Sequence, residues 1–173
     1  MSEIFVLPFF ILRFPHPTTG PTTKPTSIMA YQLSITLSGP GKTENAHWGV
    51  IVYVPGNDFG DLLHVRLIDL PSNRFQFENR TGHGLAEQDA WGLAPVTRLD
   101  SVQRAAVVTL LENEKPPVGG KDCQNWVVDG LVALEVEELV PPGTAELWNG
   151  RLGKETAAIR EDVGEDWVAL NGR

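Results

Sequence analysis

His47-Trp48-Gly49-Val50-Ile51-Val52-Tyr53 is the stretch that decides the fold. Its β-branched and aromatic residues are typical of a buried strand. Pro55-Gly56-Asn57-Asp58 is a turn signal, and the segment from Asp61 to Asp69 predicts a second strand. Because the connection is short, the two strands are expected to pair as an antiparallel hairpin, which would bring His64 near His47.

The remaining elements follow from the same patterns. Three further segments predict strands, at residues 30–37, 74–78 and 96–99. Two segments predict helices: Val102 to Glu114, capped by Asp100-Ser101, and Asp122 to Leu139. From Thr144 onward we expect one short helix and a terminal strand. The sequence therefore predicts an α+β fold with an antiparallel sheet packed against helices.

Length and charge limit the possible functions. The chain has 173 residues and a formal net charge of −8. That length fits one domain better than two. The deficit of Lys and Arg argues against a nucleic-acid partner, because a surface that follows phosphates needs positive charge. It argues more weakly against docking on anionic lipids.

The first 28 residues differ from the rest. Ile4 to Phe14 is apolar but shorter than the roughly 20 residues that span a bilayer, and Pro15 to Ser27 is rich in Pro and Thr. We expect residues 1–28 to be a disordered or tail segment and residues 29–173 to form the single domain. Two other interpretations of Ile4 to Phe14 are the apolar part of a signal peptide and a weak membrane contact.

Cys123 is the single cysteine of the chain. An internal disulfide is therefore impossible, and one free thiol fits a cytoplasmic protein. Cys123 follows Gly119-Gly120-Lys121-Asp122 and lies in the first turn of the second predicted helix. Unpaired N–H groups and the helix dipole favour a thiolate there, which makes Cys123 a candidate nucleophile. The competing interpretation is a buried structural cysteine.

The histidines supply a candidate base. His47 at a strand edge is placed to accept a proton from a thiol, and His64 is placed to orient it. The competing interpretations are a surface histidine and a hydrogen-bonded histidine on a half-buried face. His83, in Thr-Gly-His-Gly, is predicted to lie in a loop. Neither a close pair of histidine ligands nor a nucleotide-binding glycine motif is present, so we expect no metal and no cofactor.

Three motifs together resemble a known group. They are His47-Trp48-Gly49 at a strand start, Leu63-His64-Val65 in the next strand, and Asp122-Cys123-Gln124-Asn125-Trp126 opening a helix. This order resembles the permuted papain-fold proteins of the NlpC-like and lecithin:retinol acyltransferase-like group, over roughly Ala46 to Leu139. The chain also has the general look of small proteins from filamentous fungi. Gln124 and Asn125 replace the acidic residue and histidine of the acyltransferase pattern.

The resemblance implies a circularly permuted papain-like domain with Cys123 as nucleophile, His47 as base and His64 as orienting partner. Gln76, Glu78 and Asn79 are alternatives to His64. The implied function is a cysteine-dependent hydrolase or acyltransferase acting on an amide, ester or thioester carbonyl of a small-molecule, peptide or acyl substrate. The alternative is a catalytically inactive peptide- or ligand-binding module. For either function the candidate substrate-binding residues are Trp48, Gln124, Asn125 and Trp126. The competing interpretation of the two tryptophans is that they pack in the core.

Overall fold

The computed structural model describes residues 30–39 and 45–172, so the predicted tail at residues 1–28 lies outside it. The strands are β1 (Tyr31–Ser38), β2 (His47–Tyr53), β3 (Phe59–Asp69), β4 (Arg74–Gly84), β5 (Ala90–Leu99) and β6 (Val168–Ala169). The helices are α1 (Ser101–Asn113), α2 (Cys123–Val136), α3 (Thr144–Asn149) and α4 (Thr156–Val163), followed by a 3-10 turn, η1 (Gly164–Asp166). The predicted α+β class with an antiparallel sheet is confirmed.

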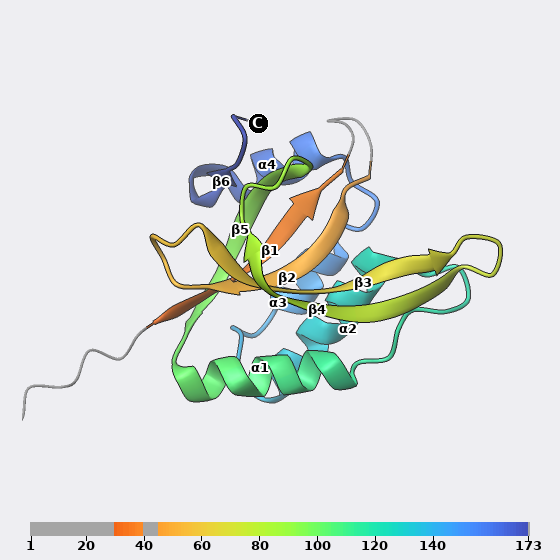
Figure 1. The fold of residues 1–173 in the computed structure, drawn as a ribbon, viewed down its shortest axis with the longest axis horizontal. Helices are drawn as coiled ribbons and strands as arrows, with labels where there is room; N and C mark the ends of the chain where they lie inside the picture. Colours follow the sequence, from red (N-terminus) through yellow and green to blue (C-terminus); the bar gives the residue numbers. More distant parts are fainter. Residues whose placement is uncertain (1–29, 40–44, 173) are drawn as a thin grey trace, which may run out of the picture.

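The strands form one six-stranded antiparallel sheet in the order β4-β3-β2-β1-β5-β6 (Figure 1). The predicted hairpin of β2 and β3 is present, with Val50 opposite Leu63 and Tyr53 opposite Gly60. In Figure 1 the β3–β4 hairpin extends sideways beyond the other strands, and α1 runs below the sheet. This meander places the residues of β2, β3 and β4 in one continuous ladder.

Two strands are longer than the sequence pattern predicts. β4 continues to Gly84, and His83 pairs with Gly60 of β3. The loop predicted for His83 is therefore wrong. The polar end of β4 has no hydrophobic alternation, and it is extended because β3 supplies hydrogen-bonding partners. β5 likewise begins at Ala90, where it pairs with Ser38 of β1.

The helices cover one face of the sheet. Alternate residues of β1, β2 and β3 enter the main core, and α1 to α4 all contribute to it. Its strand members are Leu33, Ile35, Leu37, Trp48, Val50, Val52, Leu63 and Val65. On the other face a small cluster of Ile51, Leu62 and Leu93 is buried. Because side chains alternate along a strand, this division decides which functional residues face the helices.

Both long helices begin with an aspartate cap, of which the one at Asp100 was predicted, whereas Asp122 was expected inside the second helix. The carboxylate of Asp100 accepts from the N–H groups of Val102 and Gln103, and Asp122 does the same for Gln124 and Asn125. In each case the third residue of the helix bonds back to the cap, which completes a capping box. The start of α2 at Cys123 is therefore fixed locally. The C-terminal region holds two short helices rather than the single one predicted, and ends in the expected strand.

The C-terminal segment covers the sheet at Gly92. β6 pairs with β5 at Gly92 and Leu93, and the indole of Trp167 lies against Gly92. A Cβ atom added at Gly92 would stand 2.1 Å from Cζ2 of Trp167. The absence of a side chain at Gly92 therefore lets the C-terminal segment seat on the sheet.

We predict that Gly92→Ala lowers the free energy of unfolding by about 1–3 kcal/mol, the usual effect of overpacking. Gly84→Ala is the matched control, because its added Cβ would meet nothing closer than 3.6 Å. Urea denaturation of both variants checks this. In a Trp167→Ala background the effect of Gly92→Ala should vanish; an equal loss there would contradict the packing explanation.

Candidate functional site

Two imidazoles and a carboxylate form a hydrogen-bonded chain across β2, β3 and β4. Nε2 of His47 lies 2.9 Å from Nδ1 of His64, and Nε2 of His64 lies 3.1 Å from Oε2 of Glu78. The β3–β4 register sets this geometry, because His64 stands directly opposite Glu78. His64 is thus next to His47, as expected, and of the three alternatives Glu78 is the one whose side chain bonds to it.

The chain of bonds fixes the tautomers of both rings. A carboxylate only accepts hydrogen bonds, so Nε2 of His64 carries a proton and donates it to Glu78. Nδ1 of His64 then accepts the proton of His47 Nε2. This leaves Nδ1 of His47 with a free lone pair. The arrangement is the one that a general base needs, with its basic nitrogen available and its other nitrogen held.

Two arginines hold the far end of the chain. Arg80 Nη2 lies 3.0 Å from Oε2 of Glu78, and Arg66 Nε lies 3.8 Å from the same oxygen. The hydrogen bond from Arg80 is the main reason that the pKa of Glu78 is lowered, with His64 adding to it. Glu78 is therefore an anion at neutral pH, and its charge is available to stabilise positive charge on the imidazoles.

His47 and His64 are both neutral at pH 7. Burial, followed by the neighbouring His64, lowers the pKa of His47 to about 4, against an opposing effect of Asp122. Burial also lowers the pKa of His64, with Arg80 next in importance and Glu78 opposing. A neutral imidazole is the form that accepts a proton.

Cys123 is the first residue of α2 and is 9% exposed. Burial raises the pKa of its thiol to about 11, although the nearby backbone N–H groups of Trp48 and Gln124 favour the thiolate. The expected thiolate at the helix start is therefore wrong for this conformation. Desolvation of the anion outweighs the donors at the helix terminus, and Asp122 opposes the thiolate as well.

Cys123 adjoins the backbone of β2 at Trp48. The nearby Trp48 N–H favours the thiolate of Cys123, and the side chain of Cys123 belongs to the main core. Asp122, the residue before Cys123, is among the charges that act on the pKa of His47, and Gln124 bonds to the carbonyl of Ala46, so the start of α2 lies near the start of β2. In the part of the chain that the structure describes, no hydrogen bond joins the sulfur to His47.

The four residues expected to bind substrate have other partners here. Trp48 and Trp126 are 0% exposed. Gln124 donates to the carbonyl of Ala46 and accepts from the N–H of Gly153, both at 2.9 Å. The side chain of Asn125 accepts from the N–H of Asp122 in the capping box. In this structure these side chains pack and position α2 rather than face a ligand.

The Asp122 cap also limits the donors that remain at the helix start. Its carboxylate accepts from the N–H groups of Gln124 and Asn125 at 2.9 and 3.3 Å. The Cys123 N–H, which lies outside this cap, is the helix-start donor left to meet an oxyanion.

Among residues 30–39 and 45–172 no cluster of three metal-binding side chains is present, and no helix is long and apolar enough to cross a membrane.

The buried histidine predicts a pH-dependent stability. The folded pKa of His47 lies below its unfolded value of 6.5, so unfolding takes up a proton between about pH 6.5 and 4. Stability is complete above pH 6.5 and falls as the pH drops toward 4, by about 3 kcal/mol from this group. Chemical denaturation at pH 7 and 4.5 should show a smaller loss for His47→Gln than for the wild type. Equal losses would contradict the assignment.

The raised thiol pKa predicts slow alkylation. In the folded protein, the iodoacetamide rate at Cys123 should keep rising with pH above pH 9, without a plateau, because the pKa is about 11. The urea-unfolded chain is the control, and its thiol should titrate near the ordinary cysteine pKa of about 8.5. A plateau near pH 7 in the folded protein would show that the thiol is activated.

Comparison of the chain with known proteins identifies no relative that has this site. No family model, curated protein or solved structure matches the chain. The assignment of the site therefore depends on its own residues.

Proposed function

We propose that the protein is a cysteine-dependent hydrolase or acyltransferase in which Cys123 attacks the carbonyl of an amide, ester or thioester. The observation that carries the proposal is the His47–His64–Glu78 chain. It makes Nδ1 the basic nitrogen of His47, which directly precedes Trp48, and the Trp48 N–H favours the thiolate of Cys123. The order His47, His64, Cys123 along the chain agrees with a circularly permuted papain-like arrangement, which is part of the proposal.

The first step begins from two neutral groups. As the sulfur bonds to the carbonyl carbon, the S–H proton passes to Nδ1 of His47, and the carbonyl π electrons move to the oxygen. Glu78, an anion held by Arg80, stabilises the resulting imidazolium through His64. The sulfur and Nδ1 must come within hydrogen-bond reach when substrate binds, since catalytic contacts in free enzymes are often long.

The second step releases the leaving group and then the acyl group. The Cys123 N–H stabilises the oxyanion, a type of donor that is typically worth about 3–4 kcal/mol. When the oxyanion collapses, the imidazolium returns its proton to the departing amine, alcohol or thiol, which leaves a thioester on Cys123. Water or an amine then attacks the thioester while His47 again accepts a proton, and the free thiol is regenerated.

A second candidate function is a ligand- or peptide-binding module without turnover. It is favoured by the neutral, 9% exposed thiol and by the lack of a sulfur–His47 hydrogen bond among the described residues. In that case His47, His64 and Glu78 would form a structural network, in which partly buried polar groups satisfy one another's hydrogen bonds. The two functions differ in whether an acyl group is ever found on Cys123.

Acylation by p-nitrophenyl acetate distinguishes them. For the enzyme we expect p-nitrophenolate release and an acetyl group on Cys123, identified by mass spectrometry of the peptide after rapid acid quench. His47→Gln should slow acylation by about 100-fold or more, the usual contribution of a general base. Glu78→Gln should slow acylation less, because the lost charge acts on His47 only through His64.

Two matched variants control this experiment. Cys123→Ser should abolish the adduct. His83→Gln should leave the rate unchanged, because His83 pairs with Glu87 and makes no hydrogen bond to His47, His64 or Glu78. Failure to acetylate the wild-type protein, or equal rates for wild type and His47→Gln, would remove the enzyme proposal and leave the binding module.

A further inference from the structure

Arg151 is a buried cation with little internal compensation. It lies in the loop between α3 and α4 and is 6% exposed. Its guanidinium lies over the ring of Trp148, 4.7 Å from the centroid. Nε is fully buried and, within the described residues, has no hydrogen-bond acceptor. Burial lowers the pKa of Arg151, and Asp162 only partly opposes this. A buried charge of this kind is normally paired.

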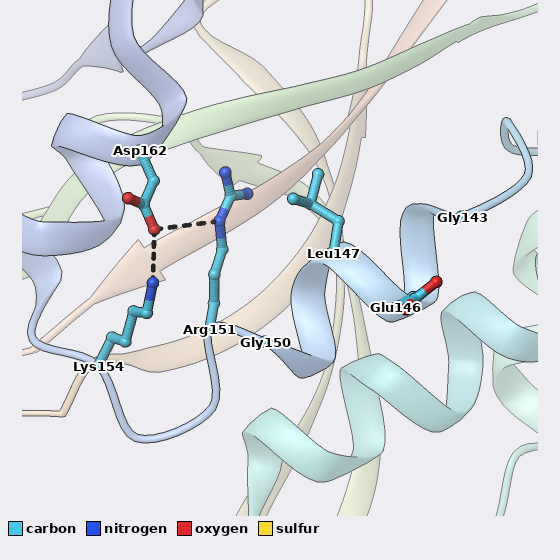
Figure 2. Close-up of a pocket in the computed structure, with 7 residues that line it drawn as sticks. All are labelled: Gly143, Glu146, Leu147, Gly150, Arg151, Lys154 and Asp162. Carbon is cyan, nitrogen blue, oxygen red and sulfur yellow. Dashed lines mark hydrogen bonds and ion pairs between the residues drawn. The ribbon is translucent and has the colours of Figure 1, made fainter.

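The one carboxylate beside Arg151 is shared with a second cation. Oδ2 of Asp162 accepts a hydrogen bond of 2.8 Å from Nζ of Lys154, whereas Nε of Arg151 is 3.9 Å away. Figure 2 shows Arg151 and Lys154 converging on the same oxygen, with the guanidinium extending between Asp162 and Leu147. Asp162 is therefore committed to Lys154, and the guanidinium retains hydrogen-bonding capacity.

Two adjoining hollows open beside this guanidinium. The larger, about 630 Å³, has Gly143 and Gly150 in its lining and Leu147 as an apolar wall. The second, about 260 Å³, shares Leu147, Arg151 and Asp162 with the first. It adds the apolar surface of Ala94, Pro95, Val96 and Trp148. A charged group at Arg151 would thus have apolar walls next to it, the usual composition of a small-molecule site.

We propose that Arg151 and Lys154 bind the carboxylate of a small monoanionic ligand whose apolar part lies against Leu147 and Trp148. The planar fork of arginine matches a carboxylate, and Lys154 adds a second donor at the same place. The site is separate from Cys123 chemistry, and its occupant binds whether or not Cys123 turns over a substrate.

The charges around the pocket favour a carboxylate over a phosphate. Glu146 and Asp162 line the larger hollow, and Asp166 lines the smaller one. These carboxylates repel a dianion more strongly than a monoanion, and the chain carries a formal net charge of −8. The apolar walls add attraction for a hydrocarbon chain, which inorganic phosphate lacks.

The test is an NMR titration of the full-length protein with hexanoate, hexanamide and inorganic phosphate. Hexanoate should shift the backbone amides of residues 143–154 saturably, with an affinity in about the millimolar range. Hexanamide, which has nearly the same shape without the charge, and phosphate should bind at least about tenfold more weakly. Equal responses to hexanoate and hexanamide, a stronger response to phosphate, or no saturable response would each overturn the proposal.

Variants give the sharper test because they change affinity in opposite directions. Arg151→Met should weaken hexanoate binding by about tenfold or more. Asp162→Asn should strengthen it about two- to fivefold, because it removes the internal carboxylate that competes for both cations. Arg160→Met, on the exposed side of α4, is the control and should have no effect.

A purely structural role for the Arg151 group does not predict tighter binding in Asp162→Asn. Weaker or unchanged affinity in a folded Asp162→Asn protein would therefore overturn the proposal even if Arg151→Met fails to fold. Circular dichroism of each variant establishes folding before the titration.

Discussion

The side-chain amide of Gln124 joins three segments that are far apart in the chain. Its nitrogen donates to Ala46 before β2, and its oxygen accepts from Gly153 in the loop after α3, while its backbone belongs to the first turn of α2. Because Gln124 is 2% exposed and Ala46 is 4% exposed, losing the amide would leave the Ala46 carbonyl buried without this partner, at about 1–3 kcal/mol. The positions of Cys123, the His47 strand and the Arg151 loop all depend on this clamp.

The candidate site combines features that sequence can and cannot supply. The hairpin pattern was sufficient to bring His64 to His47, because a short turn between two alternating strands sets their neighbours. Glu78 remained one of three alternatives, since the β3–β4 register is decided by pairing along the whole hairpin. The charge state of Cys123 was predicted wrongly. Helix-terminus arguments count local donors, whereas the thiol pKa is dominated by burial under other elements.

The fold was predictable where local patterns are strong. The capping residue Asp100 marked the start of α1, and the apolar alternation of β1 and β2 marked the centre of the sheet. It was not predictable where tertiary pairing extends a polar strand, as at the end of β4. The Arg151 pocket left no pattern either, because its walls come from β5, α3 and α4 and meet only in the folded chain.

The strand order has a consequence for self-association. On its outer side β5 is met by β6 at Gly92 and Leu93, and farther along the same strand Pro95 has no N–H to offer. A second molecule that extended the sheet there would first have to displace the C-terminal residues seated by Trp167. At the opposite boundary, Arg74, Glu78 and Arg80 punctuate β4 with charge, which opposes the stacking of edges between chains. Both margins of the sheet thus carry features that oppose its growth by edge pairing with another chain.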